Sequence, residues 1–201
     1  IEMSPDLFSL LTLIVKMAIT AGFVVAATVT AERVGPLLAG LVATLPIGAG
    51  PVYVFLALDH DAHFIAQSAL GSLVINAVNV IFAVTYARLA QTQSRTVSIG
   101  IALLVWLVLA IVVHSVTWNF AAAAIMNLIV FAICLVVVRP LRHVRVKGFH
   151  PRWTDLALRS GLVALLVGVV VTFSFQLGPA ASGMLAVFPV VLLSIMFILH
   201  N

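Results

Sequence analysis

The chain consists of long apolar runs separated by short polar interruptions. A membrane-spanning helix needs about 20 mostly apolar residues, and one run after another reaches this length. The polar stretch from His114 to Asn119 divides the apolar run 97–138 into two shorter runs. The pattern therefore predicts an all-α, polytopic transmembrane helix bundle of about seven spans. These spans are expected near residues 8–31, 37–58, 64–89, 97–114, 120–138, 156–176 and 181–200.

Composition indicates the same class of protein. Hydrophobic residues make up 64% of the chain and charged residues 8%, whereas a soluble domain is typically about half apolar and about a quarter charged. Ten basic and six acidic residues cannot cover the surface of an aqueous domain of this length. The lipid bilayer is the expected surrounding. With only Cys134 present, no disulfide framework can form.

Positive charge lies in alternate loops between the predicted spans. By the positive-inside rule these loops face the cytoplasm, which places the N-terminus, His60 and His63 outside and the loop 139–155 inside. The net charge of +4 is explained by this topology and requires no nucleic acid. Basic juxtamembrane clusters also attract anionic lipids. The candidate lipid contacts are Arg139, Arg142, Arg145 and Lys147.

A motif occurs twice in the chain. Residues 35–46 read GPLLAGLVATLP and residues 178–189 read GPAASGMLAVFP, and both fit the pattern G-P-x3-G-x2-A-x2-P without a gap. An odd number of predicted spans separates the copies, so they would have opposite orientations. Inverted-topology repeats are a recurrent design of secondary transporters. The chain would then divide into a first five-span repeat at 1–138, a basic loop at 139–155 and the start of a second repeat at 156–201.

The second repeat would be shorter than the first. Either the chain is truncated, or the protein is asymmetric, or a homodimer or partner subunit supplies the missing spans.

Predicted spans 2 and 7 are poorly built as continuous helices. Span 2 contains Pro46, Gly48, Gly50 and Pro51, and Pro189 occupies the position in span 7 that corresponds to Pro46. A proline removes a backbone hydrogen bond and clashes with the preceding turn, and in hydrocarbon the freed carbonyl needs a protein or water partner. Matching interrupted spans indicate a transporter binding site. The alternative is a kink that only improves packing.

A polar stripe follows predicted span 3, formed by Ser68, Ser72, Asn76, Asn79 and Tyr86 at helical spacing. Such side chains either hydrogen-bond neighbouring helices or line a path for a small solute or ion. Their neutral oxygens suit a polar or zwitterionic solute, or an alkali cation. The candidate substrate-binding residues are Pro46, Gly48, Gly50, Pro51, Tyr53, Asn76, Asn79, Pro189 and Ser194.

Few other side chains suggest chemistry. Lys16 and Arg159 lie within predicted spans, close enough to a helix start to reach the interface. His60 and His63 are weak metal-ligand candidates, and the alternative is a polar turn in which Asp61 caps span 3. The sequence lacks a phosphate-binding loop, a G-x-S-x-G motif and an H-E-x-x-H motif. We expect no cofactor and no enzymatic activity.

The segment AGLVATLPIGAGPVYVFLAL and its shorter echo SGMLAVFPVVLLSIMFIL resemble the proline-containing second span of the GlpM family, which comprises small four-span bacterial inner-membrane proteins. The resemblance covers one span and extends to the first span of each repeat, and this chain would look like a duplicated relative. It implies a protein of the bacterial inner membrane linked to envelope polysaccharide production. It supplies neither a substrate nor catalytic residues.

The sequence thus favours a small secondary transporter with its site at the broken spans 2 and 7. One alternative is a non-transporting scaffold or assembly subunit of an envelope complex. An intramembrane metal-dependent enzyme, which would need His60 and His63, is the third interpretation.

Overall fold

The computed structural model describes residues 5–34, 49–140 and 153–199, and within them all regular structure is helical. The helices are α1 (Pro5–Val34), α3 (Ala49–Asp59), α4 (Ala62–Leu89), α5 (Arg95–His114), α6 (Phe120–Val138), α7 (Trp153–Ala186) and α8 (Val190–Leu199). Among the predicted site residues, Pro46 and Gly48 lie outside the described residues, as do Arg142, Arg145 and Lys147 of the candidate lipid-binding cluster.

Five of these helices are long and apolar enough to cross a membrane. The shortest of the five, α6, has 19 residues, and at about 1.5 Å per residue it reaches about 28 Å, close to the ~30 Å thickness of the hydrocarbon core. Helix α3 is apolar but has only 11 residues, and it forms the second half of predicted span 2. The chain is therefore a membrane helix bundle, as its hydrophobic pattern predicts.

Short capped turns connect the helices at one end of the bundle. The side chain of Asp61 accepts a hydrogen bond of 2.8 Å from the backbone N–H of Phe64, which starts α4. Asn119 accepts one of 2.8 Å from Ala122 and starts α6. Aspartate and asparagine satisfy otherwise orphaned N–H groups at helix starts. The predicted capping role of Asp61 is confirmed.

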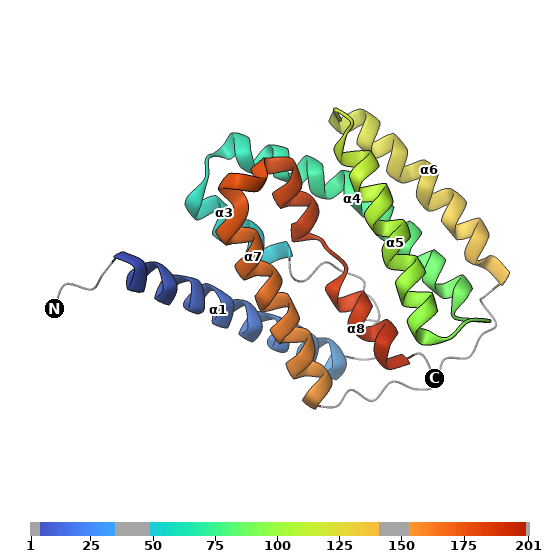
Figure 1. Cartoon of the computed structure of the whole chain (residues 1–201), viewed down its shortest axis with the longest axis horizontal. Helices are drawn as coiled ribbons and strands as arrows, with labels where there is room; N and C mark the ends of the chain where they lie inside the picture. The colour runs from blue at the N-terminus through green and yellow to red at the C-terminus, as the bar shows by residue number, and fades with distance from the viewer. Residues whose placement is uncertain (1–4, 35–48, 141–152, 200–201) are drawn as a thin grey trace.

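Helices α4 and α7 form the centre of the bundle (Figure 1). Helix α4 packs against α5, α6 and α7, while α1 and α3 pack against α7. One apolar core lies between α1, α3, α7 and α8 and includes Val52, Val167 and Val170. A second core lies between α4, α5 and α6, is joined by residues near the end of α7 and in α8, and includes Phe82 and Trp106. Because α4 and α7 are covered by neighbours, they carry half of the buried polar and charged residues in the described part of the chain.

Predicted spans 6 and 7 are found, with span 7 broken. Helix α7 is interrupted at Gly178, where φ is +73° and ψ is 173°, a backbone conformation open essentially only to glycine. Pro179 follows at the first helical position, where its missing N–H costs nothing. The chain then turns over and descends into α8 (Figure 1). We call residues 179–186 the returning segment.

A second interruption separates the returning segment from α8. Residues 187–189 are not helical, and Pro189 stands where the sequence predicts the break. Predicted span 7 therefore consists of two short helices. The inverted repeat remains a prediction, because its first motif, residues 35–46, lies outside the described residues.

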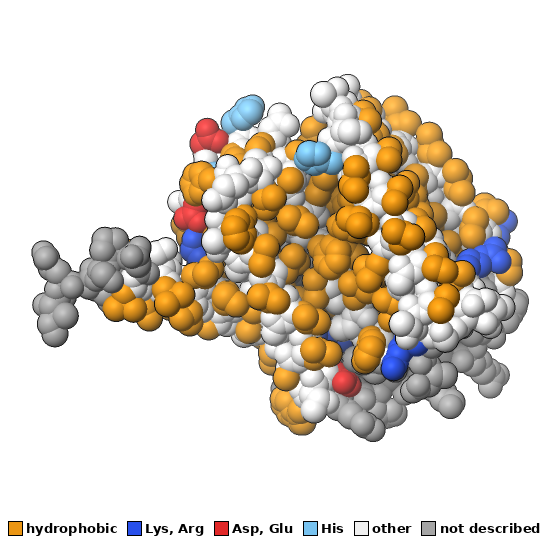
Figure 2. Space-filling view, in the orientation of Figure 1, with side chains coloured by type: hydrophobic (Ala, Val, Ile, Leu, Met, Phe, Trp, Pro, Cys, Tyr) orange, Lys and Arg blue, Asp and Glu red, His pale blue; other side chains and the backbone are white. Residues whose placement is uncertain are grey.

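Polar groups lie at the ends of the bundle and apolar groups cover its sides (Figure 2). Arg88 at the end of α4 donates a hydrogen bond to the carbonyl of Val137 in α6, and Arg95 at the start of α5 donates one to the carbonyl of Phe197 in α8. Asp59, His60 and Asp61 lie in the α3–α4 turn at the opposite end. The sides of α1, α5 and α6 expose many large apolar side chains, such as Phe8, Leu104 and Leu128, which suits contact with lipid tails.

Candidate functional site

One face of α4 binds the backbone of the broken span. Ser72 Oγ donates to the carbonyl of Gly183 at 2.6 Å, Asn79 Nδ2 donates to Val187 at 2.8 Å, and Tyr86 OH donates to Met196 at 2.9 Å. The three side chains are seven residues apart on α4, and this spacing places them on one helix face. Three of the five residues of the predicted polar stripe thus contact a single partner element.

Two of the carbonyls that accept these bonds, those of Gly183 and Val187, are left free by the break. The last four carbonyls of a helix have no donor within it, and Gly183 belongs to the last four residues of a helix that ends at Ala186. Val187 lies in the interruption itself, two residues before Pro189. In hydrocarbon such groups must be satisfied by protein or water. The side chains of α4 perform this function here.

Glycines bring the two backbones into direct contact. A Cβ atom at Gly183 would lie 1.8 Å from the carbonyl oxygen of Ser68, and one at Gly71 would lie 2.5 Å from the carbonyl oxygen of Ala180. Real Cβ atoms do not approach other atoms so closely, so only glycine fits at either position. Small residues allow membrane helices to approach in this way. The contact holds the returning segment against α4 about one helical turn before the interruption at residues 187–189.

Asn79 connects the break to α5 as well. The indole Nε1 of Trp106 donates to Asn79 Oδ1 at 2.7 Å, so the amide accepts from α5 and donates to Val187. The ring of Phe188, inside the break, meets the Trp106 ring edge-on at a centroid distance of 4.8 Å. Trp106 was not predicted as a site residue. The only available signal was a tryptophan within an apolar span, whose N–H needs a partner when buried.

Hydroxyl groups gather where α4 meets the returning segment. Tyr53 OH lies 2.6 Å from Ser72 Oγ, which in turn donates to Gly183. Because Ser72 gives its only proton to that carbonyl, Tyr53 is the donor in its pair with Ser72. Ser68 and Ser182 are fully buried nearby, and neither hydroxyl has a hydrogen-bond partner.

The remaining predicted residues have different neighbours. Asn76 donates to Asn127 Oδ1 of α6 at 3.1 Å, and the Asn127 amide donates to the carbonyls of Leu73 and Ala123. This arrangement corresponds to the helix-joining interpretation of the stripe. Asn76 therefore faces α6 and not the break.

The predicted substrate-binding prolines, glycines and serine differ in how deeply they are buried and in what they contact. Pro51 and Pro189 are buried, whereas Gly50 is exposed with open space beside it. The buried Ser194 donates to the carbonyl of Val191 in its own helix at 2.7 Å. Of the predicted site residues, Tyr53, Asn79 and Pro189 therefore lie at the break or its contact with α4.

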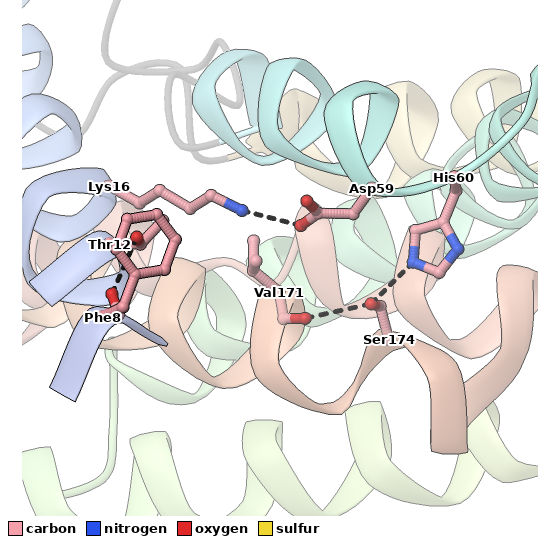
Figure 3. A network of polar contacts seen from close by, with 7 residues as sticks. All are labelled: Phe8, Thr12, Lys16, Asp59, His60, Val171 and Ser174. Atoms are coloured by element: carbon pink, nitrogen blue, oxygen red, sulfur yellow. Dashed lines mark hydrogen bonds and ion pairs between the residues drawn. The ribbon is translucent and has the colours of Figure 1, made fainter. Parts of the chain in front are cut away.

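A second polar network ties α1, α3 and α7 together at the acidic end of the bundle (Figure 3). Lys16 Nζ lies 2.7 Å from Asp59 Oδ2 and 5.7 Å from the centroid of the Phe55 ring. The Lys16 side chain is only 13% exposed. Lys16 therefore reaches the end of the bundle at which Asp59 lies, and its ammonium is paired there. Arg159 is 5% exposed.

His60 belongs to the same network. Its Nε2 lies 2.7 Å from Ser174 Oγ, and Ser174 donates to the carbonyl of Val171 at 3.0 Å, so His60 carries a proton on Nε2. The imidazole stacks on Phe64 at 3.7 Å and lies 4.2 Å from the Phe175 ring. His63 is exposed. In the part of the chain that the structure describes, no three His, Cys, Asp or Glu side chains form a group able to hold a metal ion.

Comparisons of the chain with protein-family models, with curated proteins and with solved structures found no match.

Proposed function

We propose that this membrane protein is a small secondary transporter whose moving part is the broken span formed by the returning segment and α8. The observation that carries the proposal is the break at residues 187–189, inside the bundle, with its free carbonyl held by a side chain of a neighbouring helix. Interrupted helices of this kind form substrate and ion sites near the middle of transporter bundles.

The contacts around the break suit a movable element. The returning segment and α8 are joined by three non-helical residues, which can absorb a change in backbone angles. Their attachment to α4 rests on separate hydrogen bonds from Ser72, Asn79 and Tyr86. A polar solute or a cation could replace these bonds one at a time, since both bind to amide and hydroxyl groups.

A scaffold subunit is the second candidate. The observation in its favour is that Ser72, Asn79 and Tyr86 already bond to backbone carbonyls of the same chain. In a protein that moves no solute, these side chains would only complete the backbone hydrogen bonding of a kinked helix. The resemblance to the GlpM family, with its implied bacterial inner membrane and envelope polysaccharide production, would fit this role as a subunit of an envelope complex.

Accessibility from the two sides of the membrane distinguishes these candidates without knowledge of the substrate. In a Cys134→Ala background, Val187→Cys and Phe188→Cys place single thiols at the break. A membrane-impermeant methanethiosulfonate reagent is then applied to right-side-out and to inside-out vesicles. A transporter that alternates between two open states exposes each thiol in both vesicle orientations.

Control thiols at the two ends of the bundle calibrate the assay. Ala62→Cys, at the start of α4, and Gln93→Cys, between α4 and α5, are exposed at opposite ends. Each should be modified in only one vesicle orientation, and the two should differ. Modification of Val187→Cys and Phe188→Cys from neither side, or from one side only, would contradict alternating access and favour the scaffold.

A further inference from the structure

The contact between α4 and the returning segment contains more buried oxygen atoms than the described hydrogen bonds use. Ser68 and Ser182 are both 0% exposed, and their hydroxyls lack a partner. Ser68 lies one turn before Ser72 on α4, and its own carbonyl touches Gly183. Ser182 precedes Gly183 in the chain. Both serines therefore belong to the two segments that the bond from Ser72 to the Gly183 carbonyl joins.

Several other buried hydroxyls of the bundle are bonded within their own helices. Thr20, Thr28 and Ser194 each donate to a carbonyl three or four residues earlier in their own helix, at 2.9, 2.8 and 2.7 Å. Ser68 and Ser182 also lie within helices, where such a bond is available, and do not form it. Burying a hydroxyl without a partner is costly. A bound species that uses these oxygens would remove the cost.

The chemistry of the cluster selects a cation with a single charge. Its ligands would be the neutral oxygens of three serines and one tyrosine together with a carbonyl at the C-terminal end of a short helix. Helix C-termini carry partial negative charge and favour cations. In transporters, carbonyls of unwound segments and ends of half-helices coordinate Na⁺. None of the five residues has an ionised side chain to offset a second positive charge.

The geometry points to an alkali-metal cation site formed by Tyr53, Ser68, Ser72, Ser182 and the Gly183 carbonyl, between α3, α4 and the returning segment. Its role as the site of a coupling ion rests on the proposed transport function. A cation held there binds α4 and the returning segment simultaneously. Its occupancy thereby controls whether the broken span stays attached to α4.

Thermal unfolding of the full chain in detergent tests the site directly. Melting temperatures are measured in increasing NaCl, and separately in KCl, against choline chloride at equal ionic strength. A ligand that binds only the folded state raises the melting temperature in a saturable way. We expect such a rise with Na⁺ or K⁺ and none with choline. Equal melting temperatures in all three salts would overturn the proposal.

Serine substitutions identify where the cation binds. Ser68→Ala and Ser182→Ala remove hydroxyls that make no hydrogen bond, so the fold should persist. The loss of an inner ligand should weaken the apparent cation affinity at least as much as loss of an outer-shell partner, about tenfold or more. Tyr53→Phe provides a third, isosteric variant. A cation response that is unchanged in all three variants would overturn the site.

Ser98→Ala is the matched control. Ser98 is also 0% exposed and without a partner, but it lies in the first turn of α5. Its replacement should leave the cation response intact. Loss of the response in Ser98→Ala to the same extent as in Ser68→Ala would mean that the effect is not local to the cluster, and would also overturn the site.

The two proposals fail separately. A cation response lost in Ser68→Ala, combined with thiols at the break modified from one side only, would retain the ion site and remove the transporter. Two-sided modification without any cation response would retain the transporter and remove this ion site.

Discussion

At the scale of single residues, Asn79 connects the break in span 7 to α5. Its amide accepts from Trp106 Nε1 and donates to the carbonyl of Val187, so one side chain joins three helices or their interruptions. Asn76, one turn earlier, makes one bond at 3.1 Å and is exposed. Two asparagines that look equivalent in the sequence thus have unequal roles.

Replacing Asn79 should cost more stability than replacing Asn76. Hydrogen bonds between membrane helices contribute about 0.6 kcal/mol each on average. Asn79→Ala loses two bonds and leaves a carbonyl and an indole N–H without partners, so we expect a loss of about 1–2 kcal/mol. Asn76→Ala should lose less than about 1 kcal/mol. Denaturant unfolding in mixed micelles measures both, and equal losses would show that the connection through Trp106 adds nothing.

At the scale of helices, direct contact between two backbones, without side chains between them, determines where the returning segment lies against α4. Gly71 and Gly183 allow α4 and residues 180–183 to meet without side chains between them. Gly178 provides the left-handed turn that sends the chain back. The glycines thus serve two different physical purposes, close approach and backbone conformation, within a few residues of each other.

Gly183→Ala should separate the returning segment from α4. The added methyl group would meet the Ser68 carbonyl at 1.8 Å, and because that atom belongs to a helix backbone, the helices must move apart. Overpacking of this kind costs about 1–3 kcal/mol. The measurement is the unfolding free energy together with modification of Val187→Cys, which should become faster as the break loosens.

Gly100→Ala is the control for that variant. Gly100 lies in α5 with nothing within 4 Å of an added Cβ, so alanine should be neutral or stabilise the helix by up to about 1 kcal/mol. If Gly183→Ala behaved like Gly100→Ala, the close contact would not contribute to the fold.

At the scale of the whole molecule, charge is divided between the two ends of the bundle. Arg88, Arg95 and Arg139 lie at one end, where two of them bond to carbonyls of other helices. The turn that holds Asp59, His60 and Asp61 lies at the other end, where Lys16 and Ser174 bind it to α1 and α7. Alternating helix directions bring these like groups together.

The division of charge predicts the orientation in the membrane. By the positive-inside rule the arginine end faces the cytoplasm. In intact cells, an impermeant maleimide should therefore modify Ala62→Cys and leave Gln93→Cys unmodified until the membrane is permeabilised. The opposite pattern would show that the basic loops do not determine the topology.

Local features of the sequence determined much of this fold. Long apolar runs predicted the membrane helices and Asp61 the start of α4, and Pro189 marked the break in span 7. These predictions succeed because each depends on residues close together in the chain: a span on about 20 neighbours, a cap on three, and a proline break on a single missing N–H. The inverted repeat and the GlpM resemblance remain predictions.

Only the tertiary structure decided which partners the polar groups have. The residues joined by the Asn79–Val187 bond are 108 positions apart and those of the Lys16–Asp59 pair are 43 apart, and no periodicity encodes such distances. The stripe on α4 could have faced α6, lipid or the broken span, since all are compatible with its spacing. In the packed bundle, Ser72, Asn79 and Tyr86 face the broken span, because free carbonyls in hydrocarbon need hydrogen-bond donors. The same packing left Ser68 and Ser182 without partners, which the sequence alone could not reveal.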